Sequence, residues 1–145
     1  LACRILLSCF NKNLRISYSK NGSPNLNNHQ HVSISHSGDL ACMIISEKEI
    51  GVDIEKISEK TLKMKEKFIN SHHLRLHKEE STIIWCIKES VFKFHKIGNL
   101  DFKKDIIVPE FTAKDKGEMN INFKKNILKS YYFKIGDYYL SYVCK

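Results

Sequence analysis

The chain has 145 residues, a hydrophobic fraction of 42% and a formal net charge of +8, which is typical of one globular domain with a modest core, spanning residues 1–145. No apolar run approaches the roughly 20 residues that a bilayer-spanning helix needs. The opening "LACRILLSCF" carries Arg4 and no small-residue cleavage site, so we expect neither a signal peptide nor contact with a membrane. The excess of 24 Lys and Arg over 16 Asp and Glu favours an acidic partner.

The first half of the chain alternates between strand-like and polar segments. Residues 1–10 predict a short helix, and the polar, turn-rich stretch 17–30 predicts a loop. The stretch "HVSISHSGDLACMIIS" (31–46) alternates apolar and polar residues around a Ser-Gly-Asp turn, which indicates a hairpin. "IGVDIEKI" (50–57) is then a further strand candidate.

The second half predicts helices followed by strands. Residues 60–76 show a helical pattern, and a strong helix is expected from an N-cap at Ser81 to about Lys96. Lys-Gly-Glu at 116–118 predicts a turn between short strands. "YYFKI" and "YYLSYVC", separated by Gly-Asp, indicate a closing antiparallel hairpin over 131–144. Mixed short strands with two or three helices predict an α+β fold.

Five cysteines occur without a C-x-x-C pair, and most of them lie among apolar residues. This pattern indicates buried, reduced thiols and a cytoplasmic protein. Cys86 falls inside the strong predicted helix, which favours a structural role for it over a nucleophilic one.

Two carboxylates lie two residues apart in "GVDIEK". In a strand, Asp53 and Glu55 project from one face while Val52 and Ile54 project from the other. Oxygen ligands of this kind suit Mg²⁺, which is usually bound by one or two carboxylates, waters and substrate phosphates. The alternative is a half-buried strand with a solvated acidic face, and the pattern alone does not separate the two.

The predicted helix that contains "WCIKESVFKF" has two distinct faces. At 100° per residue its core face comprises Ile84, Ile87, Val91 and Phe94. Glu89 and Lys93 lie on the opposite face, near Trp85 and Phe92. They form either an exposed pair or, because large apolar groups are rare on a solvated face, part of a covered face or binding cleft.

The segment "SISHSG" (33–38) offers hydroxyls, an imidazole and a glycine turn that suit a phosphate. The alternative is a turn that merely tolerates His36. The other histidines lack metal-ligand spacing, and we expect His72 and His73 in a helix-turn region.

Taken in order, these segments resemble the 4′-phosphopantetheinyl transferases, specifically the larger pseudodimeric type that activates surfactin synthetase and related synthases. The family pattern (V/I)-G-(V/I)-D-x-E appears as "GVDIE" and the pattern W-x-x-K-E-(A/S)-x-x-K as "WCIKESVFK". "GSPNL" and "SISHSG" match the upstream G-K-P-x-L and N-I-S-H-S patterns. The resemblance implies an α+β fold with a pseudo-twofold of two similar halves, the first one incomplete, and a monomeric protein.

The resemblance also implies a reaction. Asp53, Glu55 and Glu89 would ligate Mg²⁺ together with the diphosphate of coenzyme A. Glu89 or a water that it holds would accept the proton of a serine hydroxyl, and Lys93 would stabilise the departing phosphate. Phosphopantetheine would pass from coenzyme A to a serine of an acyl or peptidyl carrier protein, releasing 3′,5′-ADP; Asp53, Glu89 and Lys93 are thus the expected catalytic residues.

Further residues are implied to bind coenzyme A. Ser35 and His36 would lie by its 3′-phosphate end, Lys88 and Lys93 would face its phosphates, and Pro24 would contribute from the "GSP" loop. Ser23 stands where the family usually carries lysine, so one phosphate contact is expected to be absent.

Carrier proteins of this kind are acidic, which suits the net charge of +8. A part of the family domain expected before Leu1 is absent from the chain. One alternative is therefore a truncated, non-catalytic family member that binds coenzyme A or a carrier protein. A nucleic-acid-binding domain is a third reading that only the charge supports.

Overall fold

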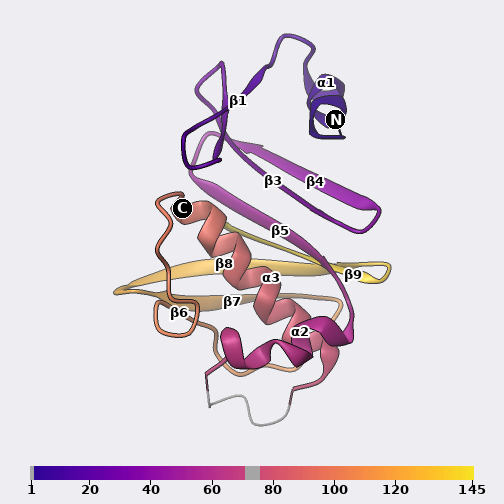
Figure 1. The fold of residues 1–145 in the computed structure, drawn as a ribbon, viewed down its shortest axis with the longest axis vertical. Coiled ribbons are helices and arrows are strands. Elements are labelled where there is room, and N and C mark those ends of the chain that lie inside the picture. The colour runs from indigo at the N-terminus through magenta and orange to yellow at the C-terminus, as the bar shows by residue number, and fades with distance from the viewer. Residues whose placement is uncertain (1, 71–75) are drawn as a thin grey trace.

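The computed structural model describes residues 2–70 and 76–145 and combines helices with antiparallel sheets (Figure 1). The helices are α1 (Ala2–Phe10), α2 (Glu59–Lys63), the short 3₁₀ helix η1 (Lys65–Lys67) and α3 (Lys78–His95). The strands are β1 (Ile16–Tyr18), β2 (Pro24–Leu26), β3 (His31–Ser37), β4 (Leu40–Ser46), β5 (Ile50–Lys56), β6 (Ile106–Ile107), β7 (Lys116–Phe123), β8 (Asn126–Ile135) and β9 (Tyr138–Cys144). The predicted α+β class is confirmed; the pseudo-twofold stays a prediction.

Helix α3 lies across one face of a five-stranded antiparallel sheet with the order β5-β9-β8-β7-β6 (Figure 1). Alternate residues of β9 divide between two clusters, because successive side chains of a strand point to opposite faces. Tyr139 and Val143 belong to the main core with α3, whereas Tyr138 and Leu140 join a cluster with β4. The sheet is therefore packed on both faces at its β5-β9 end.

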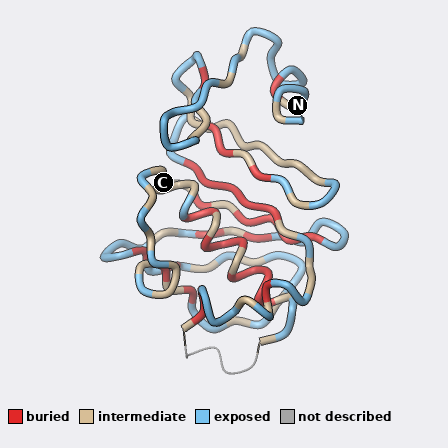
Figure 2. Tube along the Cα trace, viewed as in Figure 1, coloured by how far each residue is buried: buried red, intermediate tan, exposed pale blue. Residues whose placement is uncertain are grey.

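The predicted core face of α3 is confirmed. Ile84, Ile87 and Val91 are fully buried, and Phe94 packs against the same cluster. Figure 2 shows buried positions recurring along this helix. A glycine of β5 permits this close packing, because a Cβ at Gly51 would lie 1.9 Å from the carbonyl oxygen of Ser90. Strand β5 and helix α3 are thus held in direct backbone contact.

The predicted start of α3 is wrong. The N-cap is His77, whose backbone N–H donates to the carboxylate of Glu80 at 3.2 Å in a capping box. Ser81 lies inside the first turn and is fully buried. The helix ends at about the predicted position, at the left-handed C-cap Lys96.

The predicted hairpin over 31–46 is confirmed as β3 and β4, which pair from Ser37 opposite Leu40 onwards. One face of β4 packs on β5 and β9, and the other face of the hairpin covers a small cluster with Leu7 of α1 and Leu26 of β2. The stretch 17–30 is less irregular than predicted, because β1 and β2 form a short antiparallel pair there.

Two further predictions are wrong. A single helix over 60–76 does not form: α2 ends at Lys63, η1 follows, and His72 and His73 lie outside the described residues. The expected turn at 116–118 lies within β7, where Gly117 makes room for the ring of Tyr132 on the paired strand. In the described part of the chain, no helix combines the length and apolar character that a bilayer span requires.

Candidate active site

Six residues predicted from the sequence gather around one pocket of about 410 Å³ between β3, β5 and α3. The residues that line it are Ile34, Ser35, His36, Asp53, Glu55, Lys60, Trp85, Glu89 and Lys93. The alternation of β5 turns both carboxylates of "GVDIE" toward this pocket, and helical spacing brings Glu89 and Lys93 to it from α3. The face of α3 that carries Glu89 and Lys93 therefore forms a wall of this pocket and is not an exposed face.

Asp53 is the most enclosed carboxylate of the pocket, with 5% of its surface exposed. Its Oδ1 accepts hydrogen bonds from the ammonium of Lys93 at 2.8 Å and from the hydroxyl of Ser35 at 2.6 Å. Its second oxygen, Oδ2, is buried and has no hydrogen-bond partner among the described residues. A buried carboxylate oxygen without a donor favours a bound cation.

Serines at alternate positions of β3 hydrogen-bond to β5, which is an edge strand of the five-stranded sheet. The hydroxyl of Ser33 accepts the backbone N–H of Val52 at 2.9 Å, and the hydroxyl of Ser37 accepts that of Lys56 at 3.2 Å. These hydroxyls replace backbone acceptors that a further strand would supply, so two N–H groups on the edge of β5 are satisfied.

The same serines reach the carboxylates of the pocket. Ser35 donates to Asp53, and Ser37 donates to Oε1 of Glu55 at 3.2 Å. Sequence reasoning placed Ser37 in a turn and among the hydroxyls suited to a phosphate, and it missed this contact with Glu55. The signal was present in the period-two spacing of the three serines in "SISHS", which places their side chains on one face.

Burial and neighbouring charge shift two carboxyl groups of the pocket. Burial, together with the charge of Asp53, raises the pKa of Glu89 to about 7, although Lys93 opposes the shift. Burial also raises the pKa of Glu55 above its usual range, against the attraction of Lys60. Glu89 therefore exchanges a proton near neutral pH, as a general base requires.

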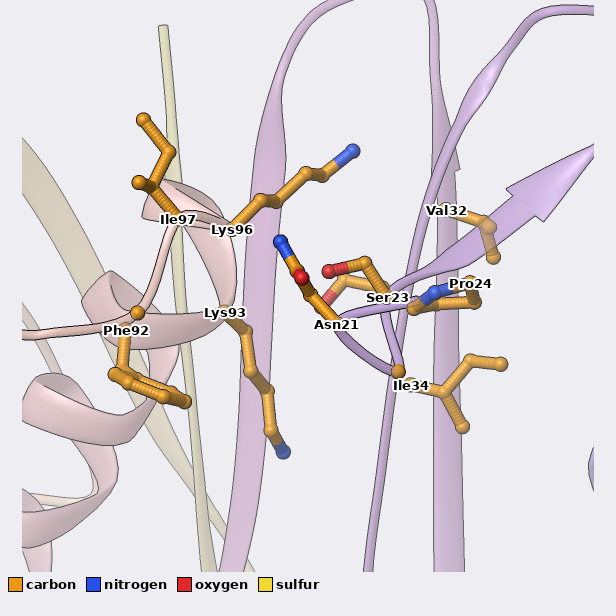
Figure 3. Close-up of a pocket in the computed structure, with 12 residues that line it drawn as sticks. Asn21, Ser23, Pro24, Val32, Ile34, Phe92, Lys93, Lys96 and Ile97 are labelled. Carbon is orange, nitrogen blue, oxygen red and sulfur yellow. The ribbon is translucent and has the colours of Figure 1, made fainter. Parts of the chain in front are cut away.

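A second pocket of about 380 Å³ adjoins the first, and Ile34 and Lys93 line both. Figure 3 shows Lys93 of α3 and the C-cap residue Lys96 on one side of it, with Pro24 and its loop on the other. Pro24 thus lines the second pocket, and its predicted contact with coenzyme A stays a prediction. Lys93 therefore lies between the two pockets and is accessible from both.

Lys88 lies away from both pockets, so its predicted position facing the phosphates is wrong. It is 2% exposed, and its ammonium donates to the backbone carbonyls of Phe102 and Ile106. Burial lowers the pKa of Lys88 to about 8. On α3, Lys88 is one residue from Glu89 and therefore about 100° around the axis, which turns it toward the core.

Cys86 has the structural role that its place in a helix predicted. It is fully buried, burial raises the pKa of its thiol well above the usual range, and its Sγ donates to the carbonyl of Asp53 at 3.1 Å. Burial of the other cysteines was overestimated, because Cys9 is exposed and the remaining three are half-buried.

The residues of the pocket fit a hard divalent cation. No three His, Cys, Asp or Glu side chains within 2–70 and 76–145 are already gathered as a metal site. Mg²⁺ does not need three, because one or two carboxylates with waters and substrate phosphates usually suffice. The unpartnered Oδ2 of Asp53, with Glu55 and Glu89 in the same pocket, supplies such oxygen ligands.

Comparison with known proteins agrees with the family that the motifs resemble. Residues 49–143, which contain both β5 and α3, match the family described as the 4′-phosphopantetheinyl transferase superfamily. The chain is also 31% identical over 96 residues to "4′-phosphopantetheinyl transferase gsp" of Aneurinibacillus migulanus, a match that covers 61% of this chain and 40% of that protein. The chain thus spans well under half of that relative's length. Because the family match covers most of the chain, the protein belongs to the 4′-phosphopantetheinyl transferase superfamily.

Proposed function

We propose that the protein transfers the 4′-phosphopantetheine group of coenzyme A to a serine of an acyl or peptidyl carrier protein, releasing 3′,5′-ADP. The observation that carries this proposal is the gathering of Asp53, Glu55, Glu89 and Lys93 in one pocket. Carboxylates beside a lysine suit a diphosphate substrate, because they bind its cation while the ammonium meets its oxygens. The name of the relative supports the same reaction.

The bond changes follow from the chemistry of a phosphoric anhydride. The serine oxygen attacks the phosphorus that bears the pantetheine arm, a new P–O bond forms, and the P–O bond to the 3′,5′-ADP phosphate breaks. Glu89, whose pKa burial raises to about 7 when no cation is bound, or a water that it holds, is suited to accept the serine proton. Lys93, whose side chain is 28% exposed at the junction of the pockets, is suited to stabilise charge on the departing phosphate.

Asp53, Glu55 and Glu89 are the residues that we propose to hold Mg²⁺. When bound, the ion would neutralise and orient the diphosphate. Ser35 holds Asp53 in place and Ser37 holds Glu55, which keeps two of these ligands in one orientation before substrate binds. Coenzyme A is long enough to require both pockets, and we propose that Pro24, His36 and Lys93 contact it.

An acidic carrier protein fits the charge near the pocket. Lys60 of α2 lines the pocket, and Lys63, Lys65 and Lys67 follow it on exposed or partly exposed positions of the neighbouring turns. Opposite charges on the two proteins would steer the carrier serine toward Glu89. We propose that the protein acts as a cytoplasmic monomer.

The test is incubation of the protein with coenzyme A, Mg²⁺ and an apo carrier protein, followed by intact-mass measurement. We expect the carrier to gain one phosphopantetheine, and Glu89→Gln to abolish the gain while the fold persists. Glu118→Gln is the matched control, since Glu118 is an exposed residue of β7 that pairs with Lys129. No gain by the native chain, with a full-length family member active in parallel, would refute the proposal.

A family member that binds without turnover is the second candidate, since the match covers 40% of the relative's length. Calorimetry separates the two functions. Binding of coenzyme A or of the carrier without any mass gain on the carrier would establish the non-catalytic reading.

A further inference from the structure

Lys88 of α3 is a buried lysine whose ammonium donates to backbone carbonyls, whereas that of Lys93 donates to a carboxylate. Lys88 is 2% exposed, and its Nζ donates to the carbonyl of Ile106 at 2.6 Å and to that of Phe102. Phe102 lies in the connection 96–105 that leads from α3 to β6, and Ile106 is the first residue of β6. A buried ammonium is costly to desolvate, and its hydrogen bonds to these two carbonyls offset that cost.

The connection folds back onto α3 immediately after the helix ends. Lys96, Gly98 and Asn99 all have positive φ, at 60°, 76° and 52°, which reverses the direction of the chain. Residues 101–105 then form a turn that local hydrogen bonds hold together. The carboxylate of Asp101 accepts two backbone N–H groups, and the backbone N–H of Asp101 donates to the carboxylate of Asp105. Lys88 joins this turn to the helix.

The same connection lines the second pocket and contacts a residue that lines the first. Ile97 and Gly98 line the second pocket directly. The ring of Phe102 packs against Trp85, which lines the first pocket, at a centroid distance of 5.7 Å, and against Phe92, which lines the second, at 5.9 Å. A displacement of residue 102 would therefore move side chains in both pockets.

We infer that Lys88 is a positioning residue: it anchors the connection 96–105 to α3 and thereby fixes the wall of Trp85, Phe92 and Ile97 against which the substrate lies. The part of this inference that concerns a substrate rests on the proposed function, with coenzyme A as the occupant. Lys88 does not touch the ligand and acts through the carbonyls of the connection. Methionine in its place would leave two carbonyl acceptors without their donor.

Trp85 provides a direct readout, because it is the single tryptophan of the chain. In Lys88→Met we expect retained secondary structure, a red-shifted Trp85 emission and faster tryptic cleavage after Lys103 or Lys104. We expect coenzyme A to bind roughly tenfold more weakly, which corresponds to about 1.4 kcal/mol. Lys104→Met, an exposed lysine of the same connection, is the matched control and should leave emission and affinity unchanged.

A second variant keeps the inference testable if Lys88→Met does not fold. Phe102→Ala removes the ring contact from a partly exposed position while Lys88 keeps its bonds, and it should give the same red shift and weaker coenzyme A binding. Unchanged emission and cleavage in a folded Lys88→Met, or unchanged emission in Phe102→Ala, would overturn the anchoring role.

Failure of the proposed function gives a different result. If the native chain does not bind coenzyme A, the proposed function fails, while emission and proteolysis still decide whether Lys88 anchors the connection. If the native chain binds coenzyme A and a folded Lys88→Met binds it equally well, the role of Lys88 toward the substrate is refuted.

Discussion

Replacement of Lys93 by methionine tests whether the buried Asp53 depends on its ion pair. The Nζ–Oδ1 distance of 2.8 Å corresponds to about 6 kcal/mol of Coulomb attraction at an effective dielectric constant of about 20. Desolvation of both ions offsets much of this attraction, and loss of one partner of a buried pair typically costs about 3–5 kcal/mol. Because Lys93 is 28% exposed and Ser35 still donates to Asp53, we expect a loss of about 3 kcal/mol in unfolding free energy.

The assay is urea denaturation of the native chain, Lys93→Met, Asp53→Asn and the double variant, followed through Trp85 fluorescence. We expect the double variant to be more stable than Lys93→Met, because the uncompensated charge is then gone. Added Mg²⁺ should raise the stability of Lys93→Met more than that of Asp53→Asn, since only the former keeps the carboxylate. Lys129→Met, which breaks the exposed pair with Glu118, should cost less than about 1 kcal/mol. A loss below about 1 kcal/mol for Lys93→Met, equal to that control, would refute the reasoning.

Two further predictions concern the carboxylates as cation ligands. Ser33→Ala and Ser37→Ala should each cost about 1 kcal/mol of stability. Of the two, only Ser37→Ala should weaken Mn²⁺ binding, measured by electron paramagnetic resonance, because Ser37 bonds the carboxylate of Glu55 whereas Ser33 bonds a backbone N–H. Equal Mn²⁺ affinity in the two variants would contradict the positioning role. The affinity for Mn²⁺ should also fall by about tenfold per pH unit below pH 7, because the proton bound to Glu89 with its raised pKa competes with the cation. This dependence should become shallower in Glu89→Gln, where only the raised pKa of Glu55 still adds to it, and a profile that is flat between pH 5 and 7 in the native chain would exclude Glu89 as a ligand.

Local periodicity was sufficient to predict the two elements that carry the site. Alternation in β5 placed Asp53 and Glu55 on one face, and the helical period of α3 separated Ile84 and Val91 from Glu89. Both patterns depend only on the geometry of the element itself. For that reason they stand although the predicted start of α3 was wrong.

The contacts of Lys88 could not be predicted in this way. Its acceptors are carbonyls 14 and 18 residues further along the chain, and only the reversal after Lys96 brings them to the helix. The same limit explains Lys-Gly-Glu at 116–118: its composition favours a turn, but pairing with β8 and the ring of Tyr132 over Gly117 make it a strand. Tertiary contacts decided both cases.

The family match covers one side of the site, formed by β5 and α3, and does not cover the other, formed by β3 and the Pro24 loop. Asp53, Glu89 and Lys93 lie within the family match over 49–143, and the backbone contact at Gly51 holds β5 and α3 together there. Ser35 and the loop around Pro24 lie before the match, yet they complete the first pocket and line the second. The proposed reaction needs both sides, because the carboxylates alone would bind a cation without orienting coenzyme A. A variant of the Pro24 loop should therefore raise the KM for coenzyme A before it lowers kcat, whereas Glu89→Gln should lower kcat directly.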